Sequence, residues 1–210
     1  MPKSFPLTAA QVNEYLATQA DEYITTYSGQ RWYLAAPTQD QIVLTDLAKA
    51  MSIEPRFNGQ THFPWPVGAH SILVYHYGLS KAAALGNEVS FDLSLGLLLH
   101  DAAEAVLKDI TKPLKNILGP IYMELQRRNT EAIYKKFEVN LSPEEEQFIH
   151  DCDMEILLTE AMSLGMDDVL EWAPAKKYKP ADIRPLRLKV DPVTHETVYT
   201  LWLKYVKHYL

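Results

Sequence analysis

The sequence predicts an all-α protein, a single helical bundle of about seven helices. Apolar residues recur at helical spacing along most of the chain. Residue types that favour helix N-termini stand before several of these stretches. The 210 residues, 47% of them hydrophobic, contain no internal repeat and no obvious linker, so we expect one domain with a substantial core.

The N-terminal quarter is expected to contain one long helix, one extended piece and one short helix. Thr8 and Gln11 have the spacing of a capping box, and apolar residues continue at helical period to Gly29, a typical C-terminal stop. Residues 31–36 favour a short extended piece ending at a proline. Residues 45–53 favour a short helix.

Two buried helices are predicted in the middle of the chain. Residues 54–65 contain two prolines and a glycine, which indicates a loop leading into Pro66, a favourable first helical residue. The helix that follows should extend to about residue 84. Ser90 can cap a second helix, which is apolar on nearly all sides and therefore belongs in the centre of the fold.

The C-terminal half completes the bundle. Ser142 and Glu145 form a second capping-box pattern, with a proline at the first helical position. The expected elements are a proline-interrupted connection over 109–119, an amphipathic helix over 120–138, a helix over 142–163, a segment of weak periodicity over 167–190 and a last helix over 192–209.

Charge and cysteine content narrow the class of protein. A net charge of -7 argues against non-specific nucleic-acid binding, which requires a basic surface. Cys152 is the only cysteine, so neither an intramolecular disulfide nor a cysteine-cluster zinc site is expected. The N-terminal residues lack a signal-type apolar region, and no stretch approaches the roughly 20 apolar residues of a membrane span. We therefore expect a cytoplasmic protein.

His100 and Asp101 stand side by side inside the most apolar helix of the chain. Such a dipeptide is common by chance, so its surroundings must decide its meaning. Burial of both groups without partners would cost several kcal/mol, which favours pairing or metal ligation. The alternative is a helix end at which both side chains reach solvent.

Two further side chains favour the metal interpretation. His70 lies on the preceding helix, and antiparallel packing of the two helices can bring it opposite His100, although a single histidine is more often a core residue. Asp153 lies among apolar residues of the helix that begins at Ser142. Two imidazoles and two carboxylates suit one divalent transition metal (Zn, Mn, Co, Fe or Ni), with open positions for water and substrate.

Two acidic residues follow the His-Asp pair. Glu104 is four residues after His100 and three after Asp101, which places it toward the same face of the helix. There it can orient or deprotonate an attacking water, whereas Asp109, at or past the helix end, is better placed to reach a leaving group. The alternative is a solvated acidic face.

Four stretches together resemble the HD-domain nucleotide phosphohydrolases, most closely the compact branch with 5′-deoxynucleotidases and phage deoxynucleoside triphosphate triphosphohydrolases. They are RFNG (56–59), VGAH (67–70), LLLHDAAEAVLKDITKPLK (97–115) and CDMEILLTEA (152–161). The resemblance covers about residues 28–165 of a single HD-type domain over 1–210, with 166–210 as a helical extension. It implies metal ligation by His70, His100, Asp101 and Asp153.

The same resemblance implies roles for other residues. Glu104 and Asp109 match acidic residues that position water and transfer protons, and Arg56 and Lys115 match phosphate-binding positions. Relatives often carry a Lys or Arg where this chain has His150, and a protonated imidazole can substitute in that phosphate contact. A nucleotide base also needs a flat apolar wall. The candidates for that wall, each equally suited to the core, are Phe57, Trp65 and Pro113.

The activity expected from these features is metal-dependent hydrolysis of deoxynucleotides. The abundance of Lys and Arg near the predicted site favours the more charged triphosphate as substrate. The resemblance to the phage enzymes implies a triphosphohydrolase that cleaves dATP to deoxynucleoside and triphosphate, with additional Mg or Mn accompanying the triphosphate. A 5′-deoxynucleotidase acting on monophosphates is one alternative. A catalytically inactive nucleotide-binding regulatory module is an alternative of a different class. The resemblance further implies a homo-oligomer, located in the host cytoplasm if phage-encoded. From the charge and the lack of a long apolar stretch we expect no nucleic-acid or membrane partner.

Overall fold

The computed structural model describes residues 7–210 and is all-α, which confirms the predicted fold class. The prediction that the N-terminal stretch lacks a signal-type apolar region falls partly on residues 1–6, which lie outside the described residues. No helix within 7–210 has the length and apolar character needed to cross a membrane. The elements are α1 (Ala9–Ala17), β1 (Tyr23–Thr25), β2 (Arg31–Tyr33), α2 (Leu44–Ile53), α3 (Val67–Ala84), α4 (Phe91–Leu99), α5 (Glu104–Leu107), α6 (Lys112–Leu118), α7 (Pro120–Lys136), α8 (Pro143–Ser163) and α9 (His195–His208).

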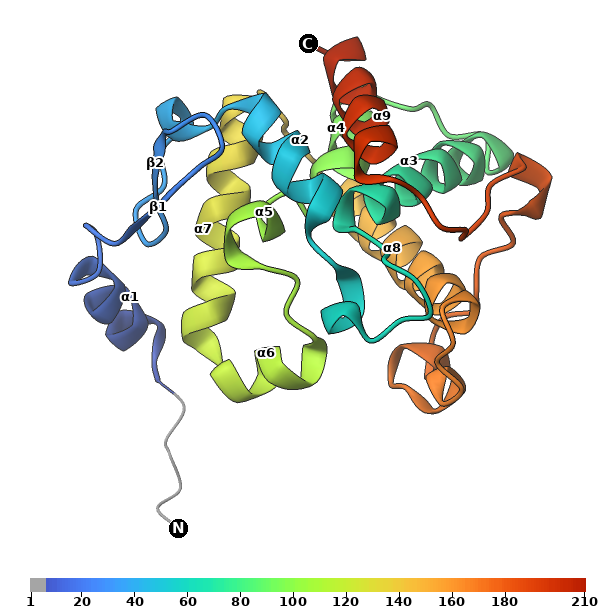
Figure 1. The fold of residues 1–210 in the computed structure, drawn as a ribbon, viewed down its shortest axis with the longest axis horizontal. Helices are drawn as coiled ribbons and strands as arrows, with labels where there is room; N and C mark the ends of the chain where they lie inside the picture. Colours follow the sequence, from blue (N-terminus) through green and yellow to red (C-terminus); the bar gives the residue numbers. More distant parts are fainter. Residues whose placement is uncertain (1–6) are drawn as a thin grey trace.

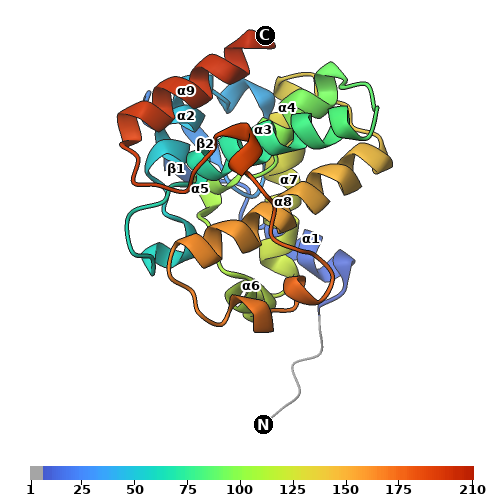
Figure 2. The ribbon, with the colours of Figure 1, turned by 90° about the vertical axis from the view of Figure 1, so that its right-hand side faces the viewer.

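Helices α3 and α4 form the centre of the bundle. α3 packs against α2, α4, α8 and α9, and Figure 1 shows α2 and α9 side by side next to it. Figure 2, turned by 90°, shows α8 crossing below α3. Every residue of α4 from Leu93 to Leu99 is buried, as its uniformly apolar surface predicts. The core is therefore built around α3, which carries His70, and α4, which ends just before His100 and Asp101.

The first helix is shorter than the sequence predicts. The capping box of Thr8 and Gln11 is present, but α1 ends at Ala17. β1 and β2 pair as an antiparallel hairpin, so the prediction of helix as far as Gly29 was wrong. The tyrosine and isoleucine of β1 suit a strand as well as a helix face, because aromatic and β-branched residues favour strands. Gly29, with φ of 87°, lies in the hairpin turn instead.

Two connections contain more helix than predicted. Residues 112–118 form α6, because Pro113 stands in the first turn, where its missing N–H leaves no helical hydrogen bond unmade. The segment between α8 and α9 contains three short 3-10 turns. The capping box of Ser142 and Glu145 is present, and α8 ends at Ser163 as predicted.

Gly68 marks a close approach of α3 to α2 and α9. A Cβ at this position would lie 2.7 Å from Val198 Cγ1 and 3.0 Å from the Met51 carbonyl oxygen. Because backbone cannot yield without separating the helices, we expect Gly68→Ala to lower the free energy of unfolding by about 1–3 kcal/mol, despite the better helix propensity of alanine. Urea denaturation measures this. Ser80→Ala on the same helix is the control, and an equal effect there would contradict the prediction.

Candidate metal centre

Four side chains from distant parts of the chain meet at one point, as predicted. His70 comes from α3, His100 and Asp101 from the turn after α4, and Asp153 from α8, and one donor atom of each lies within 4.8 Å of the others. His70 Nε2 is 3.2 Å from His100 Nε2, 3.5 Å from Asp101 Oδ2 and 3.1 Å from Asp153 Oδ1. The protein thus contains a His/Asp cluster that could bind a metal ion.

Three of these four residues lie at or next to helix ends. Pro66 precedes α3, so His70 lies in the first turn of that helix. α4 ends at Leu99, and residues 100–103 form a tight turn. His100 and Asp101 therefore follow the apolar helix, and the prediction that they lie inside it was wrong. Their side chains are nevertheless only 9% and 15% exposed. The alternative of a helix end that points into solvent therefore does not apply.

The ring nitrogens of both histidines are arranged for metal ligation. His100 Nδ1 lies 3.0 Å from the Leu97 carbonyl oxygen, and His70 Nδ1 lies 2.9 Å from Glu160 Oε2. Because these acceptors favour a proton on Nδ1, each Nε2 keeps a lone pair that faces the cluster. Ligands about 2.1 Å from one ion would stand about 3.0–3.4 Å apart. The separations found around His70, 3.1–3.5 Å, fit a divalent transition metal held by two nitrogens and two oxygens.

The cluster favours positive charge. Burial alone would raise the pKa of Asp101, but the neighbouring imidazoles and Arg56 hold that pKa far below the ordinary carboxyl range. Burial and Arg56 act to lower the pKa of His70, yet Glu160 and Asp153 outweigh them and raise it to about 10. The carboxylates around His70 thus attract either a proton or a metal cation to this point.

Glu160 on α8 is a site residue that sequence reasoning missed. Its carboxylate has 0% exposure, and it accepts a hydrogen bond from Trp65 Nε1 at 2.8 Å in addition to its contact with His70. One signal could have found it. Glu160 follows Asp153 by seven residues, two helical turns, so a second acidic residue on the face of the metal ligand was visible in the sequence.

Trp65 supports the cluster and does not line a substrate wall. The side chain has 3% exposure, and its indole N–H is bound to Glu160. A ring enclosed to this degree offers no face on which a base can stack. The expectation that Trp65 binds a base is therefore not supported by its position.

Arg56 lies against the cluster, where a phosphate-binding residue is expected. Its backbone N–H donates to the Trp65 carbonyl oxygen, and residues 57–58 adopt left-handed φ values of 55° and 53° that turn the chain back. The buried guanidinium places Nη1 3.3 Å from Asp101 Oδ2 and Nε 3.1 Å from Glu160 Oε2. The arginine is buried, with a residue exposure of 6%.

Glu104 and Asp109 flank the cluster from the segment after the His-Asp pair. Glu104 is 3% exposed, and its Oε2 has no hydrogen-bond partner within residues 7–210, while Lys115 Nζ lies 3.3 Å from its Oε1. Burial, followed by the charges of Asp101 and Asp109, raises the pKa of Glu104 well above its ordinary value. Burial likewise raises the pKa of Asp109, which lies past the end of α5 as predicted.

The remaining predicted residues lie at the periphery. Phe57 is half-buried with its ring 6.4 Å from that of Trp172, and Pro113 is exposed on α6. His150 is exposed on α8, where its ring lies 6.1 Å from the Tyr178 ring, and it is not among the side chains that form the cluster. These three positions keep their base or phosphate roles only as predictions.

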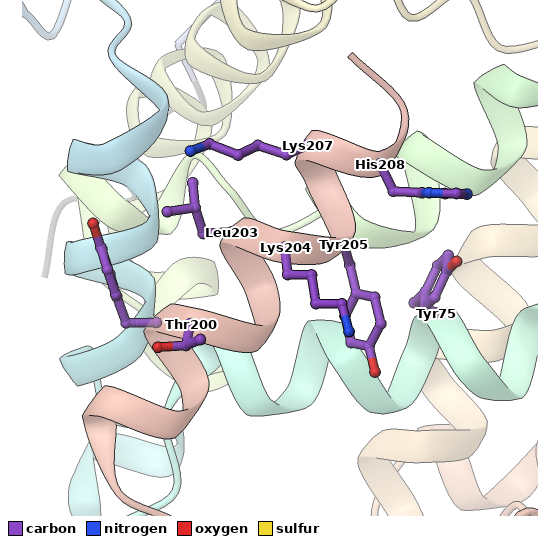
Figure 3. A pocket seen from close by; sticks show the side chains of 8 residues that line it. Tyr75, Thr200, Leu203, Lys204, Tyr205, Lys207 and His208 are labelled. Atoms are coloured by element: carbon purple, nitrogen blue, oxygen red, sulfur yellow. The ribbon is translucent and has the colours of Figure 1, made fainter.

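A hollow of about 730 Å³ lies elsewhere, on the outer side of α9. Figure 3 shows Tyr75 of α3 beside Tyr205 and Lys204 of α9 in this hollow. Its lining residues include none of the four cluster residues. Converging nitrogen and oxygen donors are stronger evidence for chemistry than the size of an open surface depression, so we take the His/Asp cluster as the candidate site.

Comparison with known proteins identifies relatives but no activity. No protein-family model matches the chain. The Escherichia coli protein YfdR is 32% identical over 158 residues, which cover 73% of this chain and 81% of YfdR. The Rhodobacter capsulatus protein RCAP_rcc00048 is 36% identical over 112 residues, which cover 52% of this chain and 55% of that protein. Both are described only as uncharacterized proteins.

Proposed function

The chain belongs to the family of the Escherichia coli protein YfdR, and from the His/Asp cluster in this family member we propose a metal-dependent phosphohydrolase of the HD-domain type that acts on deoxynucleotides. The observation that carries the proposal is the convergence of His70, His100, Asp101 and Asp153 beside a buried arginine. A structural ion-pair network would not need two imidazole nitrogens that face one point.

The residues around the cluster suit metal-assisted attack on a phosphate ester. A divalent cation bound by the four ligands would polarise a phosphoryl oxygen and lower the pKa of water. Arg56 binds the phosphate, because its planar guanidinium matches two phosphate oxygens and lies beside the ligands. Glu104 accepts the proton of the attacking water, and Asp109 returns a proton to the leaving oxygen.

Within this class we favour dATP as the substrate, with deoxyadenosine as the leaving group, triphosphate as the second product and an additional Mg or Mn ion on the triphosphate. The support is narrower than the sequence suggests. Arg127 and Arg128 are paired with Glu124 on α7, and Lys108 is exposed and paired with Glu54. Arg56, which is paired with Asp101, and Lys115, which is paired with Glu104, remain as the cations that contact the site. A 5′-deoxynucleotidase is the second candidate, since Arg56 alone suffices for one phosphate.

A substrate panel tests the proposed function. Purified protein with Mn or Co is incubated with dAMP, dATP, dGTP and ATP, and chromatography separates phosphate, diphosphate and triphosphate. We expect triphosphate and deoxyadenosine from dATP. Phosphate released from dAMP with dATP intact would establish the nucleotidase instead. Absence of hydrolysis of deoxynucleotide mono- and triphosphates by metal-loaded protein would favour a regulatory binding module.

Lys115 should distinguish the two substrates. Because a charge-assisted hydrogen bond contributes roughly 1.5–3 kcal/mol, we expect Lys115→Ala to raise KM for dATP about tenfold or more. The effect on dAMP should be much smaller, since a monophosphate is already bound by Arg56. Lys112→Ala, an exposed lysine on the same helix, is the control. Equal effects of Lys115→Ala on the two substrates would contradict its assignment to the extended phosphate chain.

A further inference from the structure

Glu160 is a fully buried carboxylate that two ring N–H groups and one guanidinium approach. Trp65 Nε1 donates to Oε1 at 2.8 Å. His70 Nδ1 lies 2.9 Å from Oε2, and Arg56 Nε lies 3.1 Å from the same oxygen. One carboxylate therefore holds a metal-ligand candidate by a hydrogen bond and the arginine beside the cluster by an ion pair.

The donor pattern requires a carboxylate at this position. With the His70 proton on Nδ1, both oxygens accept, because Trp65 presents an N–H to Oε1 and His70 presents an N–H to Oε2, while the Arg56 guanidinium forms an ion pair with Oε2. An amide of the same shape has one acceptor oxygen and one NH₂ group. Whichever way a glutamine is turned, its NH₂ group meets a donor, and the negative charge that compensates Arg56 is lost.

The geometry points to Glu160 as a positioning residue that couples metal binding to phosphate binding. By holding the proton of His70 on Nδ1, it directs Nε2 to the metal. By its ion pair with Arg56, it keeps the guanidinium beside Asp101, where a phosphate on the metal would also contact it. The identification of the anion as a phosphate rests on the proposed function. The role of Glu160 in orienting His70 does not depend on it.

Asp46 provides a matched control for the loss of a buried carboxylate. It is 5% exposed and accepts hydrogen bonds from the Thr26 and Ser28 side chains, so it holds the β1–β2 turn to α2. None of its hydrogen-bond partners is a cluster residue. Asp46→Asn and Glu160→Gln should both lower stability, but only the second should change the metal centre.

The test is a titration that needs no turnover. Mn²⁺ affinity is measured by calorimetry for the metal-free wild type, Glu160→Gln, Asp46→Asn and Arg56→Ala, with and without inorganic phosphate, and Co²⁺ absorption reports ligand geometry. We expect Glu160→Gln to bind Mn²⁺ about 10–100-fold more weakly, as outer carboxylate partners of ligating histidines do when removed. Asp46→Asn should match the wild type. Phosphate should tighten Mn²⁺ binding in the wild type but not in Glu160→Gln or Arg56→Ala.

Several results would overturn the inference. They are wild-type Mn²⁺ affinity in Glu160→Gln, an equal loss in Asp46→Asn, or an unchanged phosphate effect in Glu160→Gln. If Glu160→Gln does not fold, Glu160→Asp is measured instead, because aspartate keeps the charge but has a shorter side chain. The inference is equally overturned if this variant shows unaltered Mn²⁺ affinity, phosphate effect and Co²⁺ spectrum. A wild type that binds Mn²⁺ and phosphate but hydrolyses no deoxynucleotide would contradict the proposed function alone. A wild type that binds no Mn²⁺ overturns both.

Discussion

Replacement of His100 or Asp101 by alanine is expected to abolish stoichiometric metal binding and to slow deoxynucleotide hydrolysis by roughly 10³-fold or more, equivalent to about 4 kcal/mol. His100 supplies one of the two imidazole nitrogens at the cluster, and no other histidine belongs to it within residues 7–210 apart from His70. Asp101 has two functions, since it contributes an oxygen ligand for the metal and accepts a hydrogen bond from Arg56 Nη1 at 3.3 Å. Its loss therefore disturbs both the metal and the phosphate contact.

The measurement combines the metal content of purified protein with the rate of dATP cleavage. His76→Ala is the matched control, because this histidine lies on α3, the helix that carries His70, but its ring is 5.1 Å from the Tyr205 ring and outside the cluster. It should retain both metal and activity. Retention of wild-type metal content and hydrolysis by His100→Ala and Asp101→Ala would refute the enzyme proposal.

The four cluster residues were predictable because their chemistry conflicts with their surroundings. Asp153 stands on a largely apolar helix face and His100 directly follows a run of leucines, where unpaired polar groups are costly. The sequence therefore demanded partners for them, and His70 and Asp101 were the residue types able to provide a metal site. Helical period also located α2, α3, α4 and α8, since their apolar residues recur over several turns.

Residues whose positions depend on tertiary contacts were not predictable in this way. Trp65 looked like a loop aromatic, and only the approach of α8 shows that Glu160 occupies its N–H. The first helix was overestimated because Tyr23 and Ile24 fit helical period, while their pairing with β2 depends on a turn outside that pattern. Local periodicity carries no information about which distant element completes a hydrogen bond or a strand pair.

Glu104→Gln is expected to lower kcat by about 10²–10⁴-fold while metal content stays unchanged. Glu104 is not among the four residues whose donor atoms converge, so its removal should spare the metal. Burial and neighbouring acids raise the pKa of its carboxyl well above the ordinary value. A carboxylate with a raised pKa is a stronger base toward the attacking water. Glutamine keeps the shape and can still accept from Lys115, but it cannot transfer a proton.

The decisive comparison is between kcat for dATP and bound metal in the same preparations. Asp46→Asn replaces a buried carboxylate away from the cluster and controls for general destabilisation. It should leave both kcat and bound metal unchanged. A kcat within tenfold of the wild type would remove Glu104 from the proton transfer and leave Asp109 as the acidic residue for that step. Loss of metal together with kcat would instead make Glu104 a ligand. We expect the metal to stay and catalysis to fall, because Glu104 is not among the four residues whose donor atoms converge, and its Oε2, without a hydrogen-bond partner within residues 7–210, is available to a water molecule.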